Sequence, residues 1–281
     1  MSQQLSKYRH ISITAHYTGY IWYQLGWSHP AFATQKGKLI TRLAQPFEYF
    51  AEREFGWSVR ESLKQRHEVI DSKLEGLIET HPDLQILEIA CGLSPRGWFF
   101  RNKFPNLNYR ELDLPEMANI KNQALKAIQR NSPDVLTANI FNSEFKNILN
   151  LFDAAKPLVI ISEGLINYFD QSELKLLLSN IQNHASNFNT LYYLSDIYPE
   201  PTHSRYSKLL WVLSKILKTL SRSKFSFHFK SPLEIQNFFM ETGFKETEVL
   251  QPSLHLPANK TKKSKQHADL VWIIFSKTSA L

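Results

Sequence analysis

The sequence predicts an α/β fold built on one open, mostly parallel, doubly wound sheet of seven strands. Three observations predict it. Short apolar runs alternate with helical segments over residues 85–200, the first run ends in a glycine-containing turn, and two more strand-like runs close the chain. The closing pair would add one antiparallel strand. We expect a helical N-terminal cap over residues 1–80, then a sheet domain over residues 81–281 with an inserted lid at about residues 197–230.

The cap is expected to be helical because its apolar residues repeat with helical spacing. Between Ser62 and Thr80 they form one stripe, comprising Leu63, Val69, Ile70, Leu74, Leu77 and Ile78. Pro82 ends this helix. Aromatic residues are frequent earlier in the cap, where they either line an apolar ligand pocket or pack in the core; they are Tyr17, Tyr20, Trp22, Tyr23 and Trp27.

Five strands then alternate with helices. We place the strands at Ile86–Ala90, Asn108–Leu112, Asp134–Ala138, Leu158–Ser162 and Thr190–Ser195. The fourth run is apolar throughout, as in a parallel strand that is covered on both faces. Helices between the strands are expected from Pro95 to about Phe104, from Leu114-Pro115-Glu116 onward, and over Leu174–His184.

The alternation stops between Asp196 and about Ser231. An amphipathic helix over Leu209–Leu220 either packs as a lid over the functional site or rests on a membrane surface. The closing elements are a helix over Pro232–Thr242 capped by Gly243, and strands near Phe244–Leu250 and Asp269–Lys277.

Composition limits the class of protein. The chain has 281 residues, 43% of them hydrophobic, which is enough for one large core or two small ones. Apolar stretches such as Leu270–Phe275 are too short to span a bilayer. Cys91 is the single cysteine, so no internal disulfide can form, and the N-terminus has no secretory h-region. We therefore expect a cytoplasmic protein without a membrane span.

The formal net charge is +7, with cations concentrated over residues 208–230 and 260–265. Such clusters either bind an anionic partner or are simply solvated. No zinc-finger, homeodomain or RNA-recognition signature accompanies them, so no nucleic-acid partner is expected.

The turn after the first strand predicts a nucleotide-like ligand, because open parallel sheets bind such ligands at a strand-to-helix turn. A dinucleotide site needs the spacing G-x-G-x-x-G, but Ala90, Gly92 and Pro95 occupy these positions, so the third glycine is missing. Glu88 would repel a pyrophosphate and attract a cation. S-adenosylmethionine, with its sulfonium and ammonium groups, suits the turn better. The alternative is an ordinary strand end where glycine allows close packing. Cys91 is either a small filler or a reactive thiol.

Polar residues follow the next two strands. Asp113, about 20 residues after the turn, can bind both ribose hydroxyls or cap the next helix. Asn139 can bind an adenine edge while Ile140 packs on the ring, or it is a turn asparagine.

A carboxylate also follows the fourth strand. Glu163, with Gly164 after it, lies where substrate and cofactor would meet, and Tyr168 would form part of a wall. Because a buried unpaired carboxylate is costly, a cation such as the cofactor's ammonium would be a suitable partner for Glu163.

These segments together resemble the leucine carboxyl methyltransferase-like family of class I S-adenosylmethionine-dependent methyltransferases, which includes bacterial O-methyltransferases of polyketide type. The segments are Leu87-Glu-Ile-Ala-Cys-Gly-Leu-Ser-Pro-Arg-Gly97, Glu111-Leu-Asp-Leu-Pro-Glu-Met117 with Lys121, Ser162-Glu-Gly-Leu-Ile-Asn-Tyr-Phe169, and Arg66 with Ile70-Asp71. The resemblance covers roughly residues 62–200 and implies a Rossmann-like fold.

By resemblance, the cofactor would be S-adenosyl-L-methionine, and no metal is implied. Arg66 would pair with its carboxylate, Glu163 with its amino group, and Gly92 would line the methionine moiety. Glu88 and Ala90, from the pattern of the turn, are further cofactor-binding candidates. Asp113 would bind the ribose, and Asn139 and Ile140 the adenine. The chain departs from the family pattern at Asn139, where Asp is usual, and in its N-terminal segment.

The resulting hypothesis is a methyltransferase that transfers a methyl group to a carboxylate or hydroxyl oxygen of a small molecule. A carboxylate acceptor needs no base, whereas a hydroxyl could use His16 or Tyr168. The catalytic candidates are therefore Glu163, Tyr168 and His16. Two other classes are possible: a non-catalytic protein of the same fold that binds nucleic acid or membrane, and a nicotinamide-dependent oxidoreductase.

Overall fold

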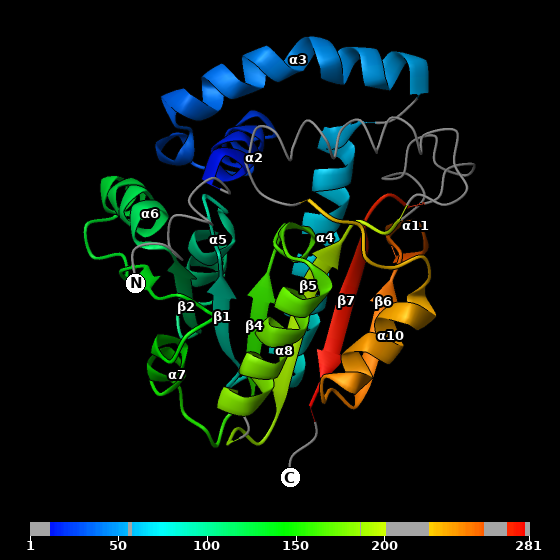
Figure 1. The fold of residues 1–281 in the computed structure, drawn as a ribbon. Coiled ribbons are helices and arrows are strands. Elements are labelled where there is room, and N and C mark those ends of the chain that lie inside the picture. Colours follow the sequence, from blue (N-terminus) through cyan, green and yellow to red (C-terminus); the bar gives the residue numbers. More distant parts are fainter. Residues whose placement is uncertain (1–11, 56–57, 186, 201–224, 256–268, 279–281) are drawn as a thin grey trace.

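The protein is described here by a computed structural model, which covers residues 12–55, 58–185, 187–200, 225–255 and 269–278 (Figure 1). The expected amphipathic helix over residues 209–220 and the lysine cluster over residues 260–265 lie outside the described residues, as does most of the expected lid.

A seven-stranded sheet forms the centre of the molecule, in the order β3-β2-β1-β4-β5-β7-β6. Neighbouring strands from β3 to β5 are parallel, and β7 is antiparallel to both β5 and β6. The predicted fold class is thus confirmed. The strands are β1 (Gln85–Ile89), β2 (Asn108–Asp113), β3 (Leu136–Thr137), β4 (Leu158–Ser162), β5 (Leu191–Ile197), β6 (Glu246–Leu250) and β7 (Trp272–Lys277).

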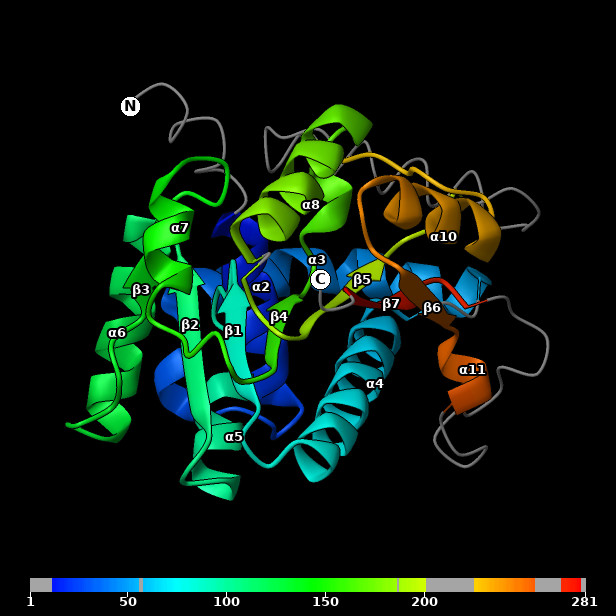
Figure 2. The same cartoon turned by 90° about the horizontal axis from the view of Figure 1, so that it is seen from below.

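Helices cover both faces of the sheet (Figure 2). One face carries α4 (Val59–Thr80), α5 (Arg96–Lys103) and α6 (Pro115–Ile128). The other carries α7 (Glu144–Leu149), α8 (Gln171–Ala185) and α10 (Pro232–Glu241), and the short α11 (Pro252–His255) follows β6. Ser58 caps α4 by accepting the N–H of Glu61, and α4 packs directly on the sheet.

The apolar run of β4 shows why the sheet needs helices on both faces. Leu158 and Ile160 point into the core under α7, α8 and α10, whereas Val159 and Ile161 point into the core under α4 and α5. All four are fully buried. Alternate side chains of one strand therefore serve two cores, as is typical of parallel sheets.

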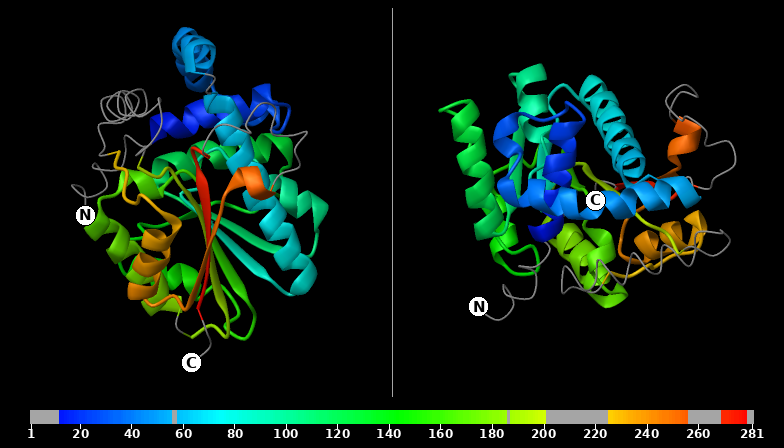
Figure 3. Two further views of the ribbon diagram at one scale, coloured as in Figure 1. Left: turned by 90° about the vertical axis from the view of Figure 1, so that its right-hand side faces the viewer. Right: turned by 90° about the horizontal axis from the view of Figure 1, so that it is seen from above.

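Three elements precede α4 and lie beyond the carboxyl ends of the parallel strands: α2 (Ser12–Gln24), η2 (Pro30–Phe32) and α3 (Gln35–Phe55) (Figure 1). Helix α2 lies nearer the sheet, and α3 crosses α2 on the side away from the sheet (Figure 3). None of the helices in the described part of the chain is long and apolar enough to cross a membrane.

Several predicted boundaries were wrong. Ala90 is not part of β1, because it turns the chain with a φ of 50°. The third strand is only two residues long, since the N–H of Val135 donates to the side chain of Asn122 instead of to a neighbouring strand. The strands β6 and β7 begin two and three residues later than predicted. The helix α7 was not predicted, because six residues are too few to show a period.

Candidate functional site

The predicted site residues gather at the carboxyl edge of the sheet. The register pairs Ile89 with both Leu112 and Ser162, so β1, β2 and β4 end at one level. From β1 the chain moves outward to β2 and β3, and later returns to β4 on the other side. The end of β1 is therefore the topological switch point, where open α/β sheets bind their ligands. The residues at this edge that are only partly buried include Ala90, Gly92, Asp113, Ile140 and Glu163.

The turn after β1 is tightly built. Ala90 and Gly92 have positive φ values of 50° and 48°. A Cβ atom on Gly92 would lie 3.0 Å from the Cβ of Ala15, so α2 packs directly on the turn. Cys91 between them is buried, and burial raises the pKa of its thiol well above the usual value. The thiol is thus protonated and packs as a filler.

Asp113 connects the turn to the start of α6. Its Oδ2 accepts the backbone N–H of Gly92 at 2.7 Å, and its Oδ1 accepts the N–H of Leu114 at 2.7 Å. The side chain therefore organises the local backbone, yet each carboxylate oxygen has a second lone pair for another donor. Burial raises the pKa of Asp113, and the two backbone N–H groups oppose that shift.

Glu88 differs from the expectation. We expected its charge to face a cationic ligand, but its side chain is 1% exposed and has partners within the chain. Its Oε1 lies 3.1 Å from Nη1 of Arg96, and its Oε2 accepts the hydroxyl of Tyr109 at 2.8 Å. The charge of Glu88 is thus compensated internally.

Arg96 is a site residue that the sequence interpretation missed. Its side chain is fully buried and donates to three carboxylates: Asp71 at 2.5 Å, Glu88 at 3.1 Å and Glu163 at 2.6 Å. It therefore links α4, β1 and the loop after β4. The signal in the sequence was the arginine directly after Ser94-Pro95, eight residues beyond a buried glutamate.

Glu163 also has basic partners in the chain. Its carboxylate lies 2.8 Å from Nε of Arg66 and 3.0 Å from Nδ1 of His67, in addition to the contact with Arg96. Burial alone would raise the pKa of Glu163, but Arg96, His67 and Arg66 together hold it well below its usual value. Glu163 is therefore ionised in this network.

Asp196 is a second missed residue. It lies near the end of β5, where it accepts from Nη1 of Arg66 at 3.2 Å and from the N–H of Gly164 at 2.6 Å. Burial raises its pKa, and Arg66 opposes the shift. No local pattern indicates this pair, since Arg66 and Asp196 are 130 positions apart in the chain.

The network contains more acid than base. Four carboxylates (Asp71, Glu88, Glu163 and Asp196) face two guanidinium groups (Arg66 and Arg96) and one imidazole (His67), so the formal charge is −2 with a neutral imidazole and −1 with a protonated one. The edge of the sheet therefore still favours a cationic ligand, although each carboxylate of the network already has a basic partner in the chain.

The predicted adenine residues form a turn. Asn139 is buried, and its Oδ1 accepts the N–H of Phe141 at 3.0 Å, as in an Asx turn. Ile140 is partly buried and packs against the core under α8. The turn interpretation of Asn139 is therefore observed, and its contact with an adenine stays a prediction.

His16 and Tyr168 lie on different elements. His16, on α2, is 5% exposed, and its Nδ1 lies 2.8 Å from Oγ1 of Thr34. Burial, and then Lys36, lower its pKa, so the imidazole is neutral at pH 7. Tyr168, in η3 (Ile166–Tyr168), is buried, and burial raises its pKa to about 12 despite a hydrogen bond to Thr14.

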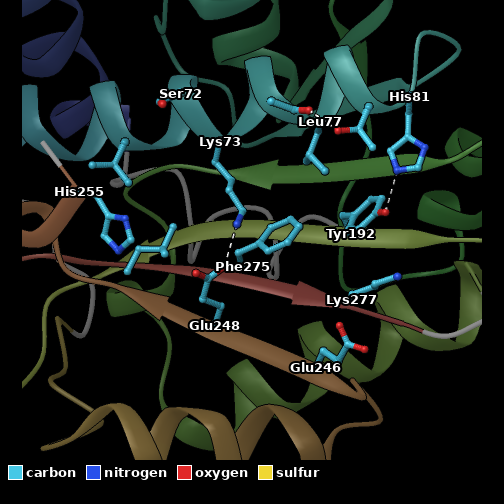
Figure 4. Close-up of a pocket in the computed structure, with 14 residues that line it drawn as sticks. Ser72, Lys73, Leu77, His81, Tyr192, Glu246, Glu248, His255, Phe275 and Lys277 are labelled. Atoms are coloured by element: carbon cyan, nitrogen blue, oxygen red, sulfur yellow. Dashed lines mark hydrogen bonds and ion pairs between the residues drawn. The ribbon is translucent and has the colours of Figure 1, made fainter.

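A groove of about 550 Å³ lies away from this edge, between α4 and the β5–β7–β6 part of the sheet (Figure 4). The stacked rings of Tyr192 and Phe275 form its floor. Lys73 reaches across the groove from α4, and its Nζ lies 2.7 Å from Oε2 of Glu248. None of the predicted site residues lines it.

A family model described as leucine carboxyl methyltransferase matches residues 31–182, which is more than half of the chain. The chain belongs to the leucine carboxyl methyltransferase family. It is thus an S-adenosylmethionine-dependent methyltransferase by family, and the matched range contains the strand ends from β1 to β4 together with Arg66 and Arg96.

Solved structures support the fold of this family member. A Thermobifida fusca YX protein assigned as a methyltransferase is 15% identical, with a TM-score of 0.61 over 89% of this chain and 93% of its own. The structure of PigF with SAH is 14% identical, with a TM-score of 0.51 over 89% of this chain and 77% of its own. A comparison with curated protein sequences found no match.

Proposed function

We propose that this methyltransferase transfers a methyl group from S-adenosylmethionine to a carboxylate or hydroxyl oxygen of a small molecule, at the carboxyl edge of β1, β2 and β4. The observation that carries the proposal is the excess negative charge of the buried network beside the turn. A cofactor with two cationic groups and one carboxylate suits a site with surplus acid and two arginines.

Each part of the cofactor would have a partner at this edge of the sheet. The backbone of Ala90 and Gly92 would line the methionine moiety, and the free lone pairs of Asp113 would accept the ribose hydroxyls. Glu163 would accept the amino group, and Arg66, its neighbour at 2.8 Å, would pair with the carboxylate. Asn139 and Ile140 would contact the adenine.

The cofactor supplies a methyl group already activated by positive sulfur. The protein then needs to hold the acceptor in line with the methyl group and to exclude water, because alignment accounts for much of the rate enhancement of such a displacement. The contact of α2 with the turn, through Ala15 and Gly92, places helical cover over this edge.

The family description favours a carboxylate as the acceptor, because it names a carboxyl group. An ionised carboxylate attacks without losing a proton, so no general base is required. For a hydroxyl acceptor, the neutral imidazole of His16 can accept a proton, whereas Tyr168 is protonated at pH 7 and can only donate a hydrogen bond.

Calorimetry with S-adenosylhomocysteine tests the binding site. We expect the wild-type protein to bind and Asp113→Ala to bind at least about tenfold more weakly, as loss of a charge-assisted hydrogen bond implies. Asp83→Ala is the matched control, since Asp83 is exposed and precedes the amino end of β1. Equal binding by all three proteins would exclude the assigned site.

The acceptor is tested with methyl-labelled cofactor and a panel of small carboxylic acids and alcohols. A methyl ester releases labelled methanol in mild alkali, whereas a methyl ether does not. Label found only in alkali-stable products would contradict the carboxylate assignment, and label on nitrogen would contradict oxygen as the target.

A further inference from the structure

His67 connects α2 and the turn that follows it to the buried charged network. It lies on α4, which begins beside α2 and α3 and runs along the sheet (Figure 1). The centroid of its ring lies 4.5 Å from that of Trp22 on α2 and 5.7 Å from that of Trp27 in the turn. The two indole rings also stack on each other, with centroids 5.8 Å apart. Both indoles therefore restrict the orientation of the buried imidazole.

The Nδ1 atom of His67 faces an ion pair. It lies 3.0 Å from Oε2 of Glu163 and 2.8 Å from Nη2 of Arg96. With a proton on Nδ1 the imidazole donates to Glu163, and without this proton it accepts from Arg96. One of the two contacts is thus a hydrogen bond in either state of the imidazole, so His67 holds the Arg96–Glu163 pair in place.

The two carboxylate oxygens of Glu163 have different numbers of neighbours. Oε2 lies within 3.0 Å of nitrogen atoms of both Arg96 and His67. Among the described residues, Oε1 has Nε of Arg66, at 2.8 Å, as its one hydrogen-bond partner. An ammonium group would therefore approach Oε1, which keeps a free lone pair. The direction of this lone pair depends on how Oε2 is held.

We infer that His67 is a positioning residue for the amino end of the cofactor, which it orients through Glu163 while Trp22 and Trp27 hold its ring. This role rests on the proposed function, because it requires that Glu163 accept the amino group of the cofactor. Binding groups must be held close to their productive geometry by the residues behind them. Residues of α2 and its following turn therefore contribute to cofactor affinity through the imidazole.

Calorimetry with two ligands tests the role of His67. S-adenosylhomocysteine carries the amino group, and 5′-methylthioadenosine has the same adenine and ribose without the amino acid moiety. We expect His67→Leu to bind the first ligand about 5- to 10-fold more weakly than the wild type does, as loss of one hydrogen bond implies. The second ligand should bind equally well to both proteins, which also shows that the variant is folded.

Two further variants separate the hydrogen bond from ring packing. The side-chain amide of Asn places a polar atom close to the position of Nδ1, whereas that of Gln reaches the position of Nε2. Both variants lack the ring, so both lose the contacts with Trp22 and Trp27. We expect His67→Asn to regain part of the affinity for S-adenosylhomocysteine and His67→Gln to bind as weakly as His67→Leu.

Trp27→Leu tests the contribution of the stacked rings. It removes one of the two indoles that contact His67, so we expect binding of S-adenosylhomocysteine to weaken several-fold and binding of 5′-methylthioadenosine to stay unchanged. Trp98→Leu is the matched control, because Trp98 is also partly buried but packs against His29 and Phe32. This variant should bind both ligands as the wild type does.

The outcomes distinguish this inference from the proposed function. A wild-type protein that binds neither ligand would overturn both. If Glu163→Gln weakens S-adenosylhomocysteine alone while His67→Leu binds it like the wild type, only the role of His67 is overturned. Equal weakening of both ligands by His67→Leu, or no difference between His67→Asn and His67→Gln, would show that the imidazole only packs. Wild-type affinities of Trp27→Leu would overturn the role of the stacked rings.

Discussion

Arg96 and Glu163 form a buried ion pair, with Nη2 of the arginine 2.6 Å from Oε2 of the glutamate. The pair joins the first residue of α5, which follows the turn after β1, to the loop after β4. Since Arg96 also contacts Glu88 and Asp71, one guanidinium group fixes the relative positions of three carboxylates.

Replacing Arg96 should therefore destabilise the fold strongly. Arg96→Met leaves Glu88 buried without its guanidinium partner and leaves Glu163 with Arg66 but without Arg96. The loss of one member of a buried pair costs about 3–5 kcal/mol. Urea unfolding measures the loss. Arg53→Met is the control, because the Arg53 side chain is 71% exposed and its removal should change the free energy of unfolding by less than about 1 kcal/mol. Equal stabilities of the two variants would contradict the role of Arg96.

Glu111 should make the stability of the protein depend on acid pH. Burial raises its pKa, but Lys121 at 2.6 Å and Arg101 at 2.7 Å lower it below the ordinary value of 4.5. A folded-state pKa below the unfolded-state pKa gives stability that is present above about pH 4.5 and is lost as the pH falls through the folded-state pKa.

The measurement compares the wild type with Glu111→Gln by urea unfolding between pH 7 and pH 3. The wild type should lose more stability than the variant over this range, because only the wild type must protonate a paired carboxylate. Parallel curves would show that Glu111 has the same pKa in the folded and unfolded states.

Gly97 should not tolerate a side chain. A Cβ atom at this position would lie 2.4 Å from Cδ of Glu111, which is held by Lys121 and Arg101 and cannot move away. We expect Gly97→Ala to lower the free energy of unfolding by at least about 1–3 kcal/mol, as overpacking does. Gly76→Ala is the control: Gly76 lies within α4 with no atom in the way, so the variant should gain about 0.5–1 kcal/mol.

The strands β3 and β4 show which boundaries of the fold can be predicted from the sequence. The strand β4 was predicted with its observed ends, because a five-residue run rich in β-branched residues, placed between a proline and a glutamate, is typical of a buried parallel strand. The strand β3 was overestimated, because the side chain of Asn122 takes the N–H of Val135 and no feature near Val135 indicates this. Local patterns thus gave the elements, whereas contacts between distant segments set their ends.

The same limit applies to the site. The positions of Gly92, Asp113 and Glu163 at strand ends could be predicted, because strand order brings such ends together. Their charge balance could not, because it depends on pairs far apart in the chain, such as Arg66 with Asp196. Gly97 closes the first motif of the family resemblance, and the structure shows that its missing side chain accommodates Glu111.

Two ligands distinguish the two ends of the proposed cofactor site. S-adenosylhomocysteine has an amino acid moiety, and 5′-methylthioadenosine has the same adenine and ribose without it. If Glu163 accepts the amino group, Glu163→Gln should weaken binding of the first ligand about 10- to 100-fold, as expected for a lost charge-assisted hydrogen bond. Binding of the second ligand should stay unchanged, which also shows that the variant is folded.

Asp113→Asn provides the opposite comparison, since the ribose is common to both ligands and both should bind more weakly to this variant. Calorimetry with the two ligands and the two variants gives four affinities. If Glu163→Gln weakens both ligands equally, Glu163 acts only by holding Arg66 and Arg96 in place, and the amino group must bind elsewhere. In that case the negative charge of the network would not contribute to binding of the cofactor's ammonium group, and the network would serve only to hold the fold together.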